Sequence, residues 1–407
     1  TILNRASGYY DRNITKLTKK RIYSVQTGRF VVRYIRVLSW KLQKESGMDK
    51  KKWIKHIPLF ILEAVVLVAA LGFLYITLRA TDSETGAEKD VIKEENIAVN
   101  PEVKEKIVEI SQTKEESKYT GIYNVAFFGV DARDGSLGKG NRSDTIMICS
   151  IDMDNHEIRL VSIYRDTYLN LGNDVYKKCN TAYALGGPEQ AIGMINMNTD
   201  LFLTDYITVG FEGLMKAVDA LGGIEMEVTE TEISHLNNYQ STMAQEMDIE
   251  YTPVTQAGKQ TLNGLQATAY CRIRYGGGDD FRRTQRQRDV LVAMMEKGKK
   301  SSIGALTEAV YGVLPSVRTS LDVQDIIPVL GMIGEYEVTV SDGFPFEGMR
   351  NGGIIGSKGN CVVPVNLEEN VIKLHELLYA EEAYEPSKDI KEFSKIIEED
   401  TKDHLMY

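Results

Sequence analysis

The amino-acid sequence predicts an α/β protein in which one transmembrane helix precedes a large layered domain. Two observations support this fold class. A single long apolar segment lies near the N-terminus, and after it short apolar runs alternate with segments of helical spacing. The chain has 407 residues, so a membrane anchor and one large domain account for its length.

Residues 57–78 form the long apolar segment, in which Glu63 is the only charged residue among 22. As a helix this segment would be roughly 33 Å long, which is enough to cross the hydrocarbon core of a bilayer. It has no polar stripe, which disfavours a buried core helix. It also lacks a small-residue cleavage pattern, which disfavours a signal peptide. We therefore expect a single membrane span.

The charges on either side of this span predict its orientation. Residues 1–56 contain 15 Lys and Arg against three acidic residues, whereas residues 81–118 contain 11 Asp and Glu against six basic residues. Basic segments stay on the cytoplasmic side, so residues 1–56 are expected to form a cytoplasmic head and the rest to lie outside the cell membrane. This location and a net charge of −10 argue against a nucleic-acid binder.

The chain beyond the span divides into three parts. Residues 79–118 lack aromatic residues and are rich in Glu and Lys, which is typical of an extracytoplasmic stalk. Within it, Asn100-Pro101 could begin a short helix. We expect the folded domain over residues 119–381 and a polar, loosely attached tail over residues 382–407.

Five strands and three helices are predicted inside the domain. The strands are expected at residues 123–130, 145–151, 159–164, 224–228 and 267–275. The helices are expected at residues 188–203, 211–221 and 289–299. The first two strands are nearly continuous apolar runs, as in strands that are buried on both faces.

The four cysteines show no C-x-x-C pair, so a zinc ribbon is not indicated. Cys149 and Cys271 lie in predicted strands and are expected to be buried thiols. Cys179 and Cys361 border predicted loops. They are the candidates for a disulfide, which an extracytoplasmic domain permits.

Arginine, aspartate and glutamine residues at the predicted strand ends are the candidate site. The sequence contains no G-x-S-x-G elbow, no H-E-x-x-H and no S-x-x-K, and its five histidines are scattered. Strand ends are where α/β folds usually bind ligands. The residues in question are Asp131, Arg142, Asp144, Arg165, Arg272, Arg274, Asp280, Arg283 and Gln287.

This cluster predicts phosphate chemistry. Arg272 and Arg274 are two apart in a predicted strand, so both side chains would project from the same face. Burying two such charges without an anion would cost several kcal/mol per charge, and a pyrophosphate would satisfy them. Two aspartates nearby are compatible with Mg²⁺, which binds one or two carboxylates together with substrate oxygens. For any single pair, a surface salt bridge is the simpler interpretation.

Six motifs together resemble the LytR–CpsA–Psr family. They are N-V-A-F-F-G-V-D-A-R (124–133), R-S-D-T-I-M (142–147), S-I-Y-R-D-T-Y (162–168), L-N-G-L-Q-A (262–267), Y-C-R-I-R-Y (270–275) and D-F-R-R-T-Q-R-Q-R (280–288). The resemblance is strong over residues 119–299 and extends weakly to residue 381. A short cytoplasmic head, one span and an outer domain are also similar to that family.

The resemblance implies an α/β/α sandwich with a central mixed sheet and a phosphotransferase activity. Such an enzyme moves a glycopolymer, usually a teichoic acid or a capsular polysaccharide, from a polyprenyl pyrophosphate carrier onto peptidoglycan with Mg²⁺ (or Mn²⁺). By position, the metal residues would be Asp131 and Asp144, and the catalytic residues Asp131, Arg142, Arg165 and Asp280. The pyrophosphate would be bound by Arg142, Arg165, Arg272, Arg274, Arg283 and Gln287.

A lipid pocket is also implied, for which the candidate lining residues are Met194, Met197, Phe202, Phe211 and Met215, although ordinary core packing is the simpler interpretation of each. Three residues depart from the family pattern: Tyr164 replaces a common proline, Cys271 a common aliphatic residue, and Arg282 a common glycine. Two alternatives stay open. One is a hydrolase of the same lipid-linked glycan, and the other is a non-catalytic membrane regulator or lipid-glycan sensor.

Overall fold

A six-stranded sheet forms the centre of the computed structural model, which describes residues 97–106, 121–132, 136–275, 280–380 and 383–406. In spatial order the strands are β10 (Glu337–Phe344), β3 (Glu157–Ile163), β2 (Ser143–Asp152), β1 (Ile122–Val130), β6 (Asp205–Val209) and β9 (Val317–Thr319). β1 pairs antiparallel with β2 and parallel with β6. The predicted α/β class with a mixed central sheet is confirmed.

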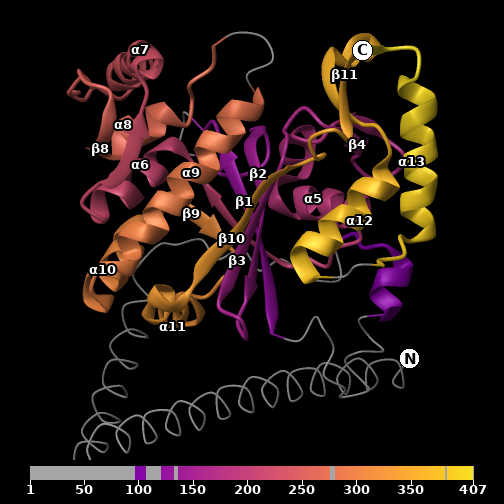
Figure 1. Ribbon diagram of the computed structural model, residues 1–407, viewed down its shortest axis with the longest axis horizontal. Coiled ribbons are helices and arrows are strands. Elements are labelled where there is room, and N and C mark those ends of the chain that lie inside the picture. The colour runs from indigo at the N-terminus through magenta and orange to yellow at the C-terminus, as the bar shows by residue number, and fades with distance from the viewer. Residues whose placement is uncertain (1–96, 107–120, 133–135, 276–279, 381–382, 407) are drawn as a thin grey trace, which may run out of the picture. The chain divides into compact units, whose positions relative to one another are not determined.

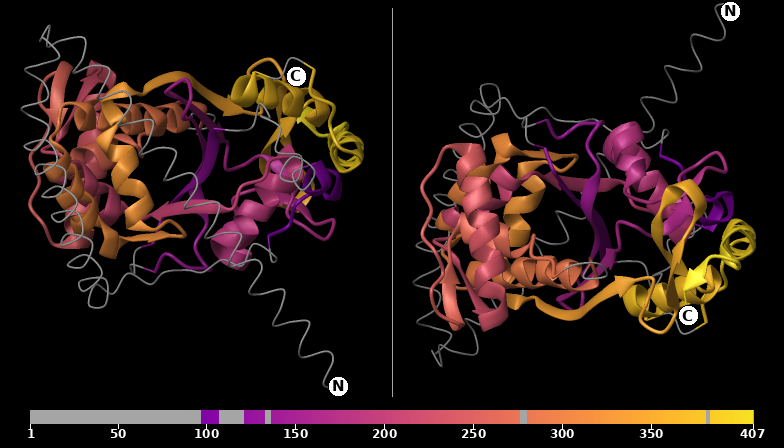
Figure 2. Two further views of the ribbon diagram at one scale, coloured as in Figure 1. Left: turned by 90° about the horizontal axis from the view of Figure 1, so that it is seen from below. Right: turned by 90° about the horizontal axis from the view of Figure 1, so that it is seen from above.

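Helices cover both faces of this sheet, as Figures 1 and 2 show. One face packs against α5 (Thr181–Thr199), α12 (Leu367–Tyr379) and α13 (Lys388–Thr401). The other face packs against α9 (Asp280–Lys299). Further helices within the described ranges are α6 (Phe211–Ala220), α7 (Glu230–Met247), α8 (Gly264–Tyr270), α10 (Ile303–Val313) and α11 (Val323–Gly331).

The sequence of β1 explains this layering. Successive side chains of a strand point to opposite faces, and both faces of β1 are apolar. Phe128 packs in the core that contains α5, whereas Phe127 packs in the core that contains Leu291 of α9. A strand that is buried on both sides must therefore be apolar at nearly every position.

Three smaller sheets surround the central one. They are β4 (Tyr168–Asn170) with β5 (Tyr176–Lys178), β7 (Ile224–Val228) with β8 (Gly258–Leu262), and β12 (Asn360–Pro364) with β11 (Arg350–Ile354) and β13 (Leu405–Met406). The strand predicted at residues 224–228 is confirmed as β7, but it pairs outside the central sheet.

The strand predicted at residues 267–275 is wrong, because this segment is helix α8 followed by a turn. Asn263 begins the helix by accepting a hydrogen bond from the amide of Gln266 at 2.9 Å, and the Gln266 side chain accepts one from the amide of Asn263 at 3.0 Å. All seven residues of α8 are buried, so its apolar run lacks helical periodicity. The argument that Arg272 and Arg274 share a strand face therefore fails.

The C-terminal segment is part of the domain, so the prediction of a loosely attached tail over residues 382–407 is wrong. Ile390 and Ile397 of α13 are buried in the main core. The backbone amide and the hydroxyl of Ser387 each donate to the Asp200 carboxylate at 2.7 Å. The C-terminal helix is thereby fixed to the end of α5.

Part of the predicted stalk also packs on the domain. Ile97 and Val103 are buried, and the Asn100 side chain donates to the carbonyl of Met197 at 3.0 Å. Residues 101–106 are helical, as the Asn100-Pro101 pair predicts. The folded part therefore includes residues on the N-terminal side of residue 119.

All four cysteines are buried free thiols, so the candidate disulfide between Cys179 and Cys361 is not formed. Burial raises the pKa of Cys149 and of Cys271 to about 12, which keeps both thiols protonated. Their predicted burial is confirmed.

The ranges that the structure describes contain no helix that is both long and apolar enough to cross a membrane. The basic head 1–56 and the predicted span 57–78 lie outside these ranges.

Candidate functional site

One cavity contains most of the predicted site residues. Its volume is about 360 Å³, and it lies between the ends of β1, β2 and β6 and the helices α6 and α9. Its charged and amide-bearing lining residues are Asp131, Asp144, Arg165, Arg272, Arg274, Arg283 and Gln287. Its apolar lining residues include Phe127, Val130, Val209, Phe211, Leu214, Leu291 and Met294. The cavity thus joins a charged region to an apolar one.

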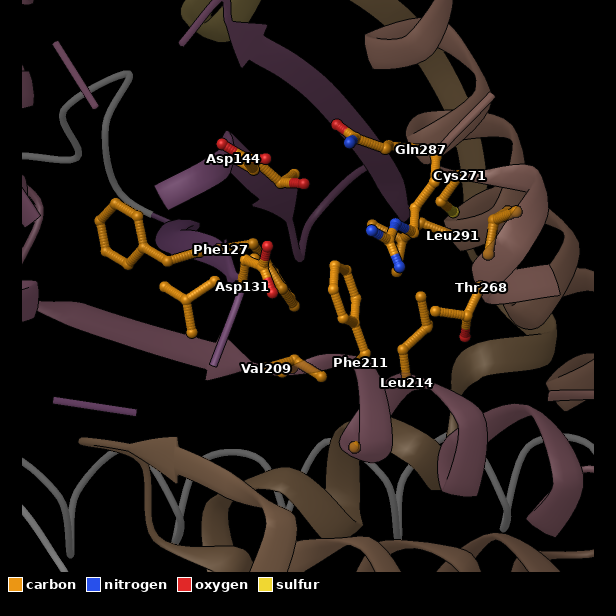
Figure 3. A pocket seen from close by; sticks show the side chains of 18 of the residues that line it. Phe127, Asp131, Asp144, Val209, Phe211, Leu214, Thr268, Cys271, Gln287 and Leu291 are labelled. Atoms are coloured by element: carbon orange, nitrogen blue, oxygen red, sulfur yellow. The ribbon is translucent and has the colours of Figure 1, made fainter. Parts of the chain in front are cut away.

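Figure 3 shows this division. Asp144 and Gln287 lie on one side of the cavity, and Val209, Phe211 and Leu214 lie on the opposite side. Helix α9 contributes to both regions, because Arg283, Gln287, Leu291 and Met294 follow the spacing of one helical face. This polar-to-apolar stripe is visible in the sequence and could have located the cavity.

Asp280 organises the arginines at the charged side. It is the first residue of α9, where the helix dipole favours a carboxylate. Its Oδ1 lies 3.1 Å from Arg283 Nη2, 3.4 Å from Arg165 Nη2 and 3.8 Å from Arg274 Nη2. Because its side chain is only 12% exposed, these contacts are little screened by solvent. Asp280 itself does not line the cavity, but it fixes the spacing of three arginines that do.

Asp144 of β2 contacts two of the arginines that Asp280 also contacts. Its Oδ1 accepts a hydrogen bond from Arg165 Nη1 at 2.8 Å, and its Oδ2 lies 3.9 Å from Arg283 Nη1. Burial opposes the charge on Arg165, but the Asp144 and Asp280 carboxylates outweigh it and raise the pKa of that guanidinium. For Arg283, burial is the largest effect and lowers the pKa, while Asp280 opposes it. Arg165 therefore remains a cation inside the cavity.

Arg272 is held by aromatic rings instead of carboxylates. Its guanidinium lies 4.6 Å from the ring centre of Phe211 and 5.4 Å from that of Tyr239. Within the part of the chain that the structure describes, its Nη1 is buried and has no hydrogen-bond partner. The same holds for Arg283 Nε and Gln287 Oε1. Buried polar atoms are rarely left unsatisfied, so these three atoms indicate a polar ligand.

The comparisons with known proteins agree with this geometry. A model of the LytR_cpsA_psr family matches residues 75–337, which is more than half of the chain. The chain belongs to the LytR–CpsA–Psr family. The cavity and every predicted site residue lie within the matched region, whereas β11, β12, α12 and α13 lie beyond it.

Two relatives are named polyisoprenyl-teichoic acid–peptidoglycan teichoic acid transferase TagU. The one from Oceanobacillus iheyensis is 32% identical over 215 residues, which cover 51% of this chain and 61% of the relative. The one from Enterococcus faecalis is 28% identical over 225 residues, which cover 53% of this chain and 69% of the relative.

A crystal structure of an Enterococcus faecalis protein, described as a transcriptional regulator, has a similar fold. Its TM-score is 0.55 at 22% identity, and the match covers 71% of this chain and 98% of that one. At this identity the likeness concerns the fold alone.

Two parts of the family-based prediction find no support in the cavity. Arg142 is exposed just before β2 and is not a lining residue. Of the five candidates for the lipid pocket, only Phe211 lines the cavity. Met194 is buried in the main core, and Phe202 is 38% exposed. The apolar lining comes mainly from strand ends, α6 and α9 instead.

Asp131 and Asp144, the predicted metal residues, line the same cavity. Within the described ranges, no group of three or more His, Cys, Asp or Glu side chains is placed to hold a metal ion. Two carboxylates fit an ion that takes its other ligands from phosphate oxygens and water, which is the usual binding mode of Mg²⁺.

A buried ion pair behind the cavity was missed in the sequence. Arg286 Nε donates to Glu232 Oε1 at 2.9 Å, and Arg286 Nη1 donates to the carbonyl of Ile273 at 3.2 Å. Ile273 lies between Arg272 and Arg274, so this pair holds the turn that carries both cavity arginines. Arg286 lies three residues after Arg283 on α9, a spacing that places both side chains near one helical face, and this was the available signal.

Proposed function

We propose that this protein is a Mg²⁺-assisted phosphotransferase that moves a glycopolymer from a polyprenyl pyrophosphate carrier onto peptidoglycan. The names of the TagU relatives support a polymer of the teichoic acid type. The observation that carries the proposal is the cavity, in which unsatisfied buried donors stand beside an apolar region. A lipid pyrophosphate combines the two matching properties, several anionic oxygens and a hydrocarbon chain.

The arginines bind and neutralise the pyrophosphate. Arg165, Arg272, Arg274 and Arg283 present guanidinium groups whose planar donors suit phosphate oxygens. Asp280 and Asp144 hold three of them in place before the substrate arrives, so little reorganisation is needed when charge develops in the transition state.

The transfer is a substitution at phosphorus. An acceptor sugar hydroxyl attacks the phosphorus atom next to the glycan, and the bond from this phosphorus to the bridging oxygen breaks. The electron pair leaves with polyprenyl phosphate, and the hydroxyl proton passes to a carboxylate, for which we assign Asp131. The glycan becomes linked to peptidoglycan through a phosphodiester.

A divalent cation fits beside the two aspartates of the cavity. Asp131 and Asp144 would hold Mg²⁺ or Mn²⁺, which when bound supplies further charge neutralisation on the phosphate oxygens. We also propose that residues 57–78 anchor the chain in the cell membrane, with residues 1–56 in the cytoplasm and the domain outside.

A reconstituted transfer assay tests the function. The full-length protein is mixed with a polyprenyl pyrophosphate-linked glycan of the teichoic acid type and peptidoglycan oligomers, and glycan covalently bound to the oligomers is measured. We expect magnesium-dependent transfer that a chelator abolishes. Free glycan phosphate without linked product would instead show a hydrolase. Binding of the lipid-linked glycan without any turnover would show a sensor.

The Asp144→Ala variant tests the aspartate in the same assay. It removes a carboxylate that contacts both Arg165 and Arg283, so we expect transfer to fall at least 100-fold, as when a preorganised charged group is lost. Asp154→Ala is the control, because Asp154 is exposed in the turn between β2 and β3. Full activity of the Asp144 variant, or undiminished wild-type activity in chelator, would remove the metal from the mechanism.

A further inference from the structure

A second cationic site lies next to the cavity and is built around Arg350, the first residue of β11. Its guanidinium lies 4.3 Å from the ring centre of Phe281 and 5.0 Å from that of Tyr164. The two rings contact each other edge to face, with centres 4.6 Å apart. Arg350 lies outside residues 75–337, so this contact is added by the C-terminal part of the chain.

The aromatic pair is closely fitted into the fold. A Cβ atom at Gly343 of β10 would lie 2.1 Å from the Tyr164 hydroxyl, so the tyrosine ring requires glycine at that position. Tyr164 is itself buried, and Phe281 is partly buried. Arg350 Nη1 donates to the carbonyl of Pro345 at 3.0 Å, which fixes the plane of the guanidinium.

Among the residues that the structure describes, no carboxylate forms an ion pair with Arg350. In the described parts of the chain its contacts are the Pro345 carbonyl and the two rings, and none is an ion pair. A second arginine, Arg288, is only 3% exposed and donates through Nε to Ser341 Oγ at 3.1 Å. Its Nη1 is buried and has no hydrogen-bond partner among the described residues.

Two acidic side chains lie in the same region. Asp342 and Glu347 both act on the Tyr164 hydroxyl, although burial is the largest cause of its raised pKa. Asp342 Oδ1 accepts a hydrogen bond from the amide of Gly343 at 2.7 Å, and Glu347 is exposed. Neither forms an ion pair with Arg350 or Arg288 within the described residues, so both guanidinium groups keep donors for an external anion.

The position of this site indicates what it binds. Tyr164 directly precedes Arg165, and Phe281 directly follows Asp280, so the aromatic pair adjoins the charged side of the cavity. Neither Tyr164, Phe281 nor Arg350 lines the cavity itself. An anion bound here would therefore belong to a part of the substrate beyond the pyrophosphate.

We propose that Arg350, stacked on Phe281 and Tyr164, forms a subsite for a phosphate or carboxylate group on a saccharide chain. The proposal rests on the proposed function, because the glycan end of the lipid pyrophosphate and the acceptor hydroxyl must both lie on this side of the cavity. A guanidinium that is held on aromatic rings keeps its outer donors in a fixed plane, which suits bidentate binding of such an anion.

The anionic group has two possible sources, which are the transferred glycan and the peptide carboxylates of the acceptor. Two glycan-donor substrates distinguish these sources. One is a polyprenyl pyrophosphate with a neutral disaccharide, and the other is the same molecule with one glycerol phosphate on its outer sugar. Two acceptors complete the set, namely peptidoglycan oligomers with free and with amidated peptide carboxylates. The rate of transfer is measured for all four combinations.

The test variant is Arg350→Gln in the full-length protein. We expect kcat/KM to fall about 10- to 100-fold for the combinations that carry the recognised anion, as for loss of a charge-assisted hydrogen bond, and less than twofold for the neutral ones. If kcat/KM falls only with the substrate that carries glycerol phosphate, the subsite binds the transferred glycan. If kcat/KM falls only with oligomers that have free peptide carboxylates, the subsite binds the peptidoglycan acceptor.

Lys358→Gln is the matched control. Lys358 lies between β11 and β12 with its ammonium 4.7 Å from the ring centre of Tyr168, so it is also a cation stacked on a tyrosine. Its loss should leave the ratio of rates between charged and neutral substrates unchanged. An equal fall of all four rates with Arg350→Gln, or no fall, would overturn the subsite. Absence of wild-type transfer in all four combinations would instead contradict the proposed function.

Discussion

Arg272 and Arg283 occupy the same cavity but are held in different ways. Arg283 is paired with Asp280 at 3.1 Å and its side chain is 6% exposed, so its removal would leave a buried carboxylate with fewer partners. Arg272 is stacked on Phe211 and Tyr239 and has no ion pair within the described residues. Mutation of Arg272 is therefore the cleaner test of substrate binding.

We expect Arg272→Lys to lose activity without losing stability. Lysine keeps the charge but not the planar donors, so about 2–4 kcal/mol of transition-state stabilisation should be lost, as for one preorganised donor. This corresponds to a roughly 30- to 1,000-fold lower transfer rate. Transfer rate and thermal unfolding should be measured together.

Arg159→Lys serves as the control for that experiment. Arg159 lies on β3 outside the cavity, where it bonds Asp152, Glu157 and the carbonyl of Leu378. Its replacement should lower the melting temperature and leave the transfer rate nearly unchanged. A near-normal rate for Arg272→Lys would contradict a phosphate-binding role for Arg272.

The buried Arg286–Glu232 pair predicts a pH-dependent contribution to stability. Burial alone would raise the pKa of Glu232, but hydrogen bonds from the Thr229 amide and from Arg286 outweigh it and hold this pKa below its ordinary value of 4.5. A lowered folded-state pKa gives stability that is fully present above pH 4.5 and is lost as the pH falls through the folded-state pKa.

The Glu232→Gln variant tests this linkage. At pH 7 it should unfold with about 3–5 kcal/mol less free energy than the wild type, because Arg286 loses its buried partner. The difference should shrink as the pH is lowered below 4.5, where Glu232 of the wild type becomes protonated first in the unfolded chain and then in the folded protein. Urea unfolding at pH 7, 5 and 3.5 measures it, and a constant difference across this range would rule out the linkage.

At the scale of the elements, Ile390 should be important for stability although it lies in a segment of polar appearance. It is completely buried in the main core, so Ile390→Ala should cost about 2–5 kcal/mol in the free energy of unfolding. Lys395→Ala, on the exposed side of the same helix, should change it by less than about 0.5 kcal/mol. Equal effects of the two substitutions would show that α13 is not packed as described.

The central strands and α9 were predictable because their patterns are local. Apolar runs located β1, β2 and β3, and helical spacing located α6 and α9. The α8 segment was assigned as a strand because total burial removes periodicity, although Asn263 and Gln266 carried a capping signal. The packing of α13 could not be predicted, because its contact with α5 through Asp200 and Ser387 joins residues 187 positions apart.

The candidate site was predictable in its chemistry and less so in its geometry. Arg and Asp residues at strand ends indicated a phosphate site, and seven of the nine candidates line one cavity. The exceptions are Arg142, which is exposed, and Asp280, which acts through three arginines. The tertiary fold decides whether a residue lines the cavity or supports a lining residue from behind. Spacing in the sequence does not distinguish these two kinds of position.

For the whole molecule, the charge asymmetry around residues 57–78 predicts the topology. Protease added to intact cells should cut in residues 79–96 or 107–118, because residues 97–106 pack on the domain. The product is a fragment that contains the central sheet and the helices that cover it, detected by an antibody against the C-terminus. Complete protection of intact cells, with cleavage only after lysis, would reverse the orientation.

The stripe along α9 has a consequence for turnover. In the proposed reaction, Arg283 and Gln287 would contact the part of the ligand that changes during transfer. Leu291 and Met294 line the part of the cavity suited to the hydrocarbon chain, which would not change. After transfer, polyprenyl phosphate therefore keeps its apolar contacts and loses only some of the polar ones. Departure of the spent carrier, and not bond breakage, would then limit the steady-state rate, so the first cycle should be faster than those that follow.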